Sequence, residues 1–99
     1  MNPRLEVYYD GSCRLCRAEI GALAAADANG VLDLRDCAAA SFDDATPRAA
    51  GIDRAALMTA LHVRDGAGRW HVGVDAFVAL YRAVGIESMA RLWGQTRQK

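Results

Sequence analysis

The chain has 99 residues, 53% of them hydrophobic, which is enough for one modest core and excludes a disordered chain. Its twelve basic and twelve acidic residues cancel, which argues against nucleic acid or an anionic membrane surface as a partner. With no apolar run near the ~18 residues of a membrane span, no signal peptide at the N-terminus and only three cysteines, we expect a cytoplasmic protein whose cysteines are reduced.

The first third of the chain predicts a strand, a helix and a second strand. Residues 5–9 are β-branched and aromatic, which favours a strand, and residues 10–12 have turn chemistry. Apolar residues at helical spacing predict a helix over 13–27, ended by Asn29-Gly30. Alternation over 31–35 predicts the second strand, which should run parallel to the first because a helix joins them.

Two short helices are expected in the middle of the chain. Thr46-Pro47 is typical of a cap followed by the first helical residue, and Gly51 would close that helix. Asp53 is placed to cap a second short helix that runs through Met58.

The last third predicts a hairpin followed by helices. Residues 61–64 and 69–72 flank a Gly-containing loop, as in an antiparallel hairpin. Apolar spacing then predicts a helix over 74–84, and Ser88 would cap a last helix before the polar tail at 95–99.

The resulting order, β-α-β-α-β-β-α, is that of a minimal thioredoxin-like domain. We therefore predict an α/β, three-layer fold in which helices flank a four-stranded mixed sheet. Residues 1–99 should form a single domain, with its core over about 5–93.

The chemistry is concentrated in a CxxC pair, Cys13 and Cys16, between the first strand and the first helix. The positive end of the helix, together with Arg14, should lower the pKa of Cys13 below the usual value of about 8.5. Cys16 lies one turn later on the same side and should be more buried. A reactive thiolate beside a resolving thiol is typical of a redox motif.

A metal site is the main alternative, because CxxC is also half of many zinc sites. Cys37 and either His62 or His71 could complete the ligand set, although the chain has neither a second CxxC nor an HxxxH motif. A small zinc-binding or protein-interaction module using Cys13, Cys16, Cys37 and a His therefore stays open beside the redox function.

Four residues are candidates for supporting the cysteines. Asp10 has two possible roles, which can coexist. We favour a carboxylate that caps the turn, and the second role is to accept the Cys16 proton. Gly11 would supply unusual backbone angles and Ser12 the N-cap of the helix. Cys37 ends the second strand at the same sheet edge, and we favour a small buried residue over a third redox thiol.

The remaining histidines and aromatic residues are expected to be structural. His62 and His71 are predicted to be surface residues of the hairpin, and one of Tyr8 and Tyr9 should pack in the core because they alternate across the first strand. The other large aromatic residues are expected to be core or edge cover: Phe77, Tyr81, Trp70 and Trp93.

Residues 8–16 resemble the opening motif, a strand and then D-G-x-C-x-x-C, of the DCC family of predicted thiol–disulfide oxidoreductases. Residues 61–77 are similar to that family's hairpin and G-x-D-A helix start, so the resemblance covers about 5–93. It implies a thioredoxin-like fold and a redox-active pair, Cys13 and Cys16, and it directs attention to Asp10.

The expected reaction is thiol–disulfide exchange, with Cys13 as nucleophile and Cys16 as resolving thiol. It needs no bound cofactor or metal, only a disulfide-containing protein or small-molecule substrate and a thiol reductant. Neither Pro3 nor Pro47 directly precedes the third strand, where thioredoxins place a cis-proline. Residues 58–60 should occupy that place.

Overall fold

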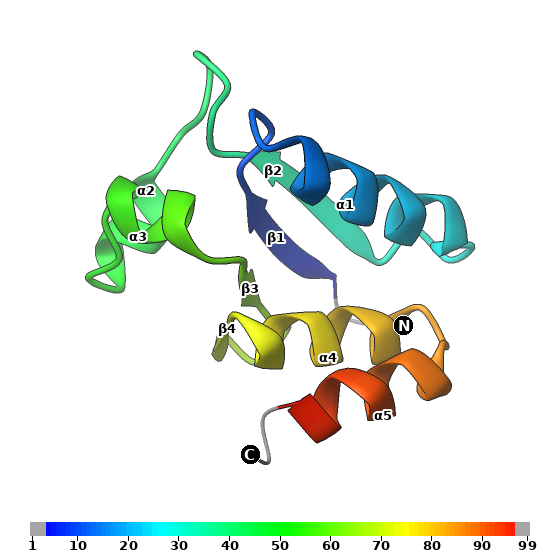
Figure 1. Cartoon of the computed structure of the whole chain (residues 1–99). Helices are drawn as coiled ribbons and strands as arrows, with labels where there is room; N and C mark the ends of the chain where they lie inside the picture. The colour runs from blue at the N-terminus through cyan, green and yellow to red at the C-terminus, as the bar shows by residue number, and fades with distance from the viewer. Residues whose placement is uncertain (1–3, 97–99) are drawn as a thin grey trace.

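The computed structural model describes residues 4–96, which form one sheet and five helices (Figure 1). The strands are β1 (Leu5–Tyr9), β2 (Leu32–Asp36), β3 (His62–Arg64) and β4 (Trp70–Val72). The helices are α1 (Arg14–Ala26), α2 (Ala45–Ala49), α3 (Arg54–Thr59), α4 (Val74–Ala83) and α5 (Glu87–Thr96).

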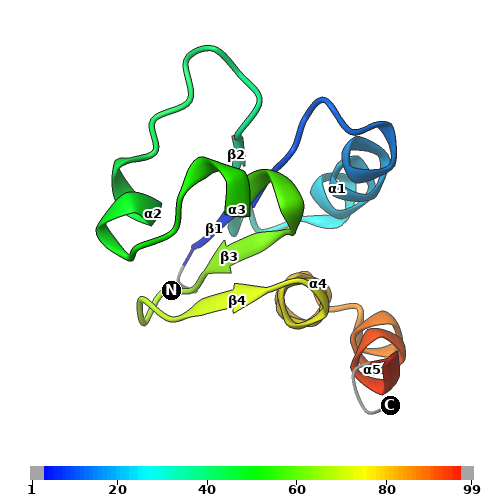
Figure 2. The same ribbon diagram turned by 60° about the vertical axis from the view of Figure 1, so that its left-hand side comes forward.

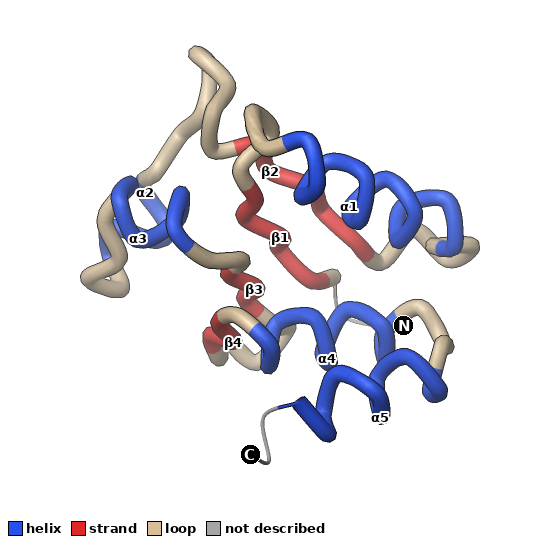
Figure 3. Tube along the Cα trace, in the orientation of Figure 1, coloured by secondary structure: helices blue, strands red, loops and turns tan. Residues whose placement is uncertain are grey.

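The sheet is mixed and has the strand order β2-β1-β3-β4. β1 runs parallel to β2, so Tyr9 and Asp36 lie side by side where both strands end. β3 lies between β1 and β4 (Figure 3) and is antiparallel to both. This brings the start of β3 to that same edge, with His62 opposite Tyr8. The predicted parallel pair followed by an antiparallel hairpin is confirmed.

Helices cover both faces of the sheet, and the alternation of β1 shows how (Figure 2). Val7 points to the face covered by α1 and α4, where it packs in a cluster with Leu23 and Leu80. Tyr8 points to the face covered by α3 and packs with Leu57. Tyr8 is fully buried, as expected for one of the two tyrosines. The architecture is the predicted three-layer, thioredoxin-like α/β fold.

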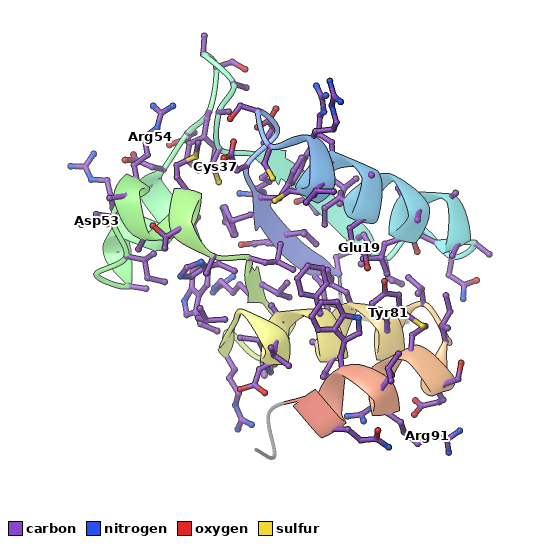
Figure 4. All side chains as sticks on the ribbon, in the orientation of Figure 1. Glu19, Cys37, Asp53, Arg54, Tyr81 and Arg91 are labelled. Carbon is purple, nitrogen blue, oxygen red and sulfur yellow. The ribbon has the colours of Figure 1, made fainter. Side chains whose placement is uncertain are left out.

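The cysteine-bearing helix α1 is fixed along its length. The hydroxyl of Tyr81, on α4, donates a hydrogen bond to the carboxylate of Glu19 near the middle of α1, and the two side chains point toward one another in Figure 4. After α1, the Asp27 carboxylate accepts the backbone N–H groups of Val31 and Leu32 at 2.9 and 3.0 Å. The sequence patterns did not indicate that Glu19 helps to position α1.

Several predicted helix ends are confirmed. Asp53 caps α3, because its carboxylate accepts the N–H of Ala56 at 2.8 Å. Gly85, with φ +83°, follows α4 in the left-handed region where glycine is favoured.

Two other predicted helix starts are wrong by a residue or two. α2 begins at Ala45, whose N–H is accepted by the Asp43 carboxylate, so Thr46 lies inside the helix instead of capping it. α5 begins at Glu87, because the carbonyl of Ile86 accepts the N–H of Ala90 at 3.1 Å. Ser88 is therefore in the first turn and is not the cap.

The two histidines of the hairpin differ from each other. His62 is buried because β3 is an inner strand, and its Nδ1 is hydrogen-bonded to the carbonyl of Ala60 at 2.9 Å. The prediction of a surface residue is wrong for His62. His71 is partly exposed, with its Nε2 2.9 Å from the carboxylate of Asp65.

Within residues 4–96, no helix has the length and apolar character needed to cross a bilayer.

Candidate active site

The turn between β1 and α1 carries the CxxC segment and is closed by Asp10. The carbonyl of Asp10 accepts the N–H of Cys13 at 3.1 Å. Its carboxylate oxygen Oδ1 accepts both the N–H and the hydroxyl of Ser12, at 2.9 and 2.5 Å. Asp10 thus has the turn-capping role that the sequence favoured.

The sulfur of Cys13 occupies the N-cap of α1. Its Sγ accepts the N–H of Cys16 at 3.3 Å, and its carbonyl accepts the N–H of Arg17 at 3.0 Å. Ser12, predicted as the cap, lies one residue too early, and its hydroxyl is held by Asp10 instead. The sulfur atom of Cys13 therefore faces the free N–H groups at the helix start.

Gly11 is required by a close approach between two strand ends. Asp36, the last residue of β2, accepts the N–H groups of Gly11 and Ala38 with one carboxylate oxygen, at 2.8 and 2.9 Å. A Cβ on Gly11 would lie 2.0 Å from the other oxygen, Oδ2. Positive φ, the expected reason, does not apply, since Gly11 is not among the glycines with positive φ.

Asp36 is a site residue that the sequence analysis missed. Its place at the site could have been predicted from the parallel pairing of the two strands. Parallel strands end at the same sheet edge, so an acidic residue at the end of β2 lies beside the turn after β1.

The two cysteines of the motif have opposite pKa shifts. The pKa of Cys13 is lowered, chiefly by hydrogen bonds from the thiol and the N–H of Cys16, and is opposed by the charge of Asp10. The pKa of Cys16 is raised to about 11 by the hydrogen bond to Cys13 and by burial. Both thiols are partly exposed. The difference between their pKa values therefore comes more from the hydrogen bond between them than from the expected difference in burial. Arg14 is exposed on the first turn, and its contribution stays a prediction.

Cys37 lies directly after β2 (Figure 4). Its side chain is fully buried against Tyr8 and Leu57. Its N–H donates to the carbonyl of Tyr9 at 2.8 Å. Burial raises the pKa of Cys37 to about 11, so the thiol is protonated at neutral pH. The structure thus supports the preferred interpretation of a small buried residue.

The candidate zinc ligands are not brought together. Within residues 4–96 no group of three or more His, Cys, Asp and Glu side chains is arranged to hold a metal ion. The imidazole of His62 is hydrogen-bonded to the carbonyl of Ala60 and that of His71 to the carboxylate of Asp65, both partners being close in the sequence.

A cavity of about 330 Å³, here called the apolar cavity, lies beside Cys16 and the end of β1. Asp10 and Cys16 line it, as do residues 58–60, at the end of α3 and the start of the link to β3, directly before the third strand as expected. α4 and α5 contribute Phe77 and Trp93, whose rings stack at 4.4 Å. Most of the residues that line it are apolar: Ile20, Leu57, Met58, Ala60, Leu61, Val74, Phe77 and Trp93.

Alkylation should reach Cys13 first. Because its pKa is lowered and that of Cys16 and Cys37 is raised, a brief iodoacetamide pulse near neutral pH should label Cys13, and Cys37 last. The Asp10→Asn variant keeps an oxygen that can accept the hydrogen bonds of Ser12 but removes the negative charge. In this variant the midpoint of the pH dependence of Cys13 alkylation should move to lower pH. Mass spectrometry of pulses across pH measures both. Earlier labelling of Cys16 or Cys37 would show that Cys13 is not the nucleophile.

The family model described as DCC1-like thiol-disulfide oxidoreductase matches residues 7–97, most of the chain. No curated protein and no solved structure matches the chain.

Proposed function

The chain belongs to the DCC1-like thiol-disulfide oxidoreductase family, and from this we propose that it exchanges disulfides through Cys13 and Cys16. The observation that carries the proposal is the sulfur of Cys13 at the N-cap of α1, 3.3 Å from the N–H of Cys16. The pKa of Cys13 is lowered and that of Cys16 is raised, so the pair offers one thiolate and one protonated thiol that can act later in the cycle.

The proposed cycle has two steps. The Cys13 thiolate attacks one sulfur of the substrate disulfide, so that bond breaks, a mixed disulfide forms and the leaving thiolate takes up a proton. Cys16 then loses its proton and attacks the sulfur of Cys13, which releases the partner as a thiolate. The partner has gained two electrons, and Cys13 and Cys16 are left joined by a disulfide that an external thiol reductant must reduce.

The first step prepares the second. The hydrogen bond to Cys13 is the largest cause of the raised pKa of Cys16. Once Cys13 is in a mixed disulfide it no longer carries charge, so that cause weakens and the Cys16 proton is released more easily. Asp10 lines the same cavity as Cys16, and we propose that its carboxylate accepts this proton.

The partners follow from the same chemistry. The substrate is a disulfide-containing protein or small molecule, and a thiol reductant resets the pair. We place the reaction in the cytoplasm, where structural disulfides are rare and those that form are usually transient and catalytic or redox-sensing.

Turnover tests this proposal. With dithiothreitol as reductant, the wild-type protein should accelerate reduction of a peptide disulfide, and Cys13→Ser should not. Cys37→Ala should keep turnover near that of the wild type, because two cysteines suffice and Cys37 is buried. Circular dichroism of each variant controls for folding. A folded Cys37→Ala protein without turnover would give Cys37 a catalytic role.

A further inference from the structure

The apolar cavity and the thiol pair share one residue, Cys16, so the cavity lies next to the sulfur of Cys13. Cys16 lines the cavity, and its N–H lies 3.3 Å from the sulfur of Cys13. A substrate cysteine joined to Cys13 in the mixed disulfide can therefore place its neighbouring residue in the cavity. At about 330 Å³ the cavity is at the small end of ligand pockets, which suits one large side chain.

The lining also sets which charge can enter. Asp10 is the one charged residue among the described residues that line the cavity. Hydrogen bonds from the hydroxyl and N–H of Ser12 lower its pKa, so it is ionised at neutral pH. An acidic substrate side chain that enters the cavity would meet this like charge, which is unfavourable. A neutral apolar side chain would instead contact Phe77 and Trp93.

Two further features indicate a polypeptide substrate that is held by its side chains. Leu15, between the two cysteines, is 81% exposed, and its apolar surface would be buried by a chain extending past Cys13. In addition, the backbone N–H and carbonyl of Ala60, which lines the cavity, are both already hydrogen-bonded within the chain. Its N–H donates to the carbonyl of Ala56 at 3.3 Å, and its carbonyl is bonded to His62 at 2.9 Å.

We propose that the substrate is a polypeptide disulfide in which a large, uncharged apolar residue adjoins the attacked cysteine and occupies the apolar cavity. This rests on the proposed exchange function and adds its specificity. Recognition comes from the cavity and Leu15, and an acidic neighbour is rejected by Asp10.

Matched peptides test the specificity. Each carries one cysteine in a mixed disulfide with 2-mercaptoethanol, and only the neighbouring residue changes, among Phe, Ala and Glu, on each side of the cysteine in turn. After subtraction of the rate with reductant alone, kcat/KM should be about tenfold higher for Phe than for Ala, and lowest for Glu. In Asp10→Asn the Glu peptide should recover relative to Ala.

A pair of variants on α5 locates the effect. Trp93→Ala removes a wall of the cavity, so the ratio of Phe to Ala rates should fall toward one. Leu92→Ala removes a neighbouring, 56% exposed apolar side chain that does not line the cavity, and the ratio should persist. The wild-type peptide series decides the matter even if Trp93→Ala does not fold.

The outcomes separate this inference from the function it rests on. Exchange at equal rates with all three peptides would overturn the specificity and leave the exchange function standing. No acceleration with any peptide would overturn the exchange function itself. If a Phe-Cys dipeptide reacts as fast as the longer peptide, the polypeptide part of the inference is wrong.

Discussion

Replacing Cys16 with Ser should stall the protein with a partner attached to Cys13. The substitution leaves the Cys13 thiolate at the N-cap of α1 but removes the thiol that resolves the mixed disulfide. Turnover should fall by at least about a hundredfold, because the attack that is lost is intramolecular and favoured by proximity. The measurement is an adduct in cell extract that dithiothreitol releases, seen on non-reducing gels and by mass spectrometry.

Three variants bound this result. Cys13→Ser should form no adduct, because the first attack cannot occur. Cys16→Ser combined with Cys37→Ala should trap at least as well as the single variant, and better if Cys37 can substitute as the resolving thiol. Asp10→Asn, with Cys16 present, should form a longer-lived adduct than the wild type if Asp10 accepts the Cys16 proton.

One result would replace the redox function with the alternative. If purified Cys16→Ser forms no adduct, loses stoichiometric zinc that the wild type holds and unfolds, the cysteines serve a metal module. Zinc content and circular dichroism of both proteins give that answer directly.

Gly11→Ala should destabilise the protein by on the order of 3 kcal/mol. The added Cβ would lie 2.0 Å from an oxygen of the Asp36 carboxylate, so the carboxylate must move. Movement weakens its hydrogen bonds to the N–H groups of Gly11 and Ala38, both shorter than 3 Å. Urea unfolding of the reduced protein measures the loss, and an unchanged midpoint would contradict the close approach.

Gly21→Ala is the matched control within α1. A Cβ there meets nothing within 4 Å, so the substitution should stabilise the helix by about 0.5–1 kcal/mol. The cause of the Gly11 effect is tested by repeating Gly11→Ala in an Asp36→Ala background. With the carboxylate gone the added methyl has room, so its cost should be much smaller than in the wild type.

The sequence was sufficient for features that depend on local patterns. Residues 5–9 alternate as a strand, apolar spacing marks α1 and α4, and Asp53 caps α3, because each depends on neighbours a few residues away. The position of the CxxC at a strand-to-helix turn is equally local. The match to the family confirms the resemblance drawn from residues 8–16 and 61–77.

The features that were missed depend on contacts between distant segments. The carboxylate of Asp36 reaches the N–H of Gly11 only because β1 and β2 pair in register. His62 is buried because β1 and β4 flank its strand, which its own neighbours in the sequence do not reveal. The cap at Cys13 is an exception with a local cause: the Asp10 carboxylate, two residues away, holds the Ser12 hydroxyl that was expected to cap the helix.

The attachment of α1 at three levels bears on the step from dithiol to disulfide in the proposed cycle. Asp36 holds the turn before the helix, Tyr81 binds Glu19 near its middle, and Asp27 ties its end to β2. Because the helix is held in this way, we expect it neither to tilt nor to slide if a bond forms between Cys13 and Cys16. The rearrangement should then be confined to the two side chains and the first turn of α1, with the rest of the backbone unchanged. On this basis we expect exchange to proceed without a slow conformational step, at a speed set by the sulfur chemistry itself.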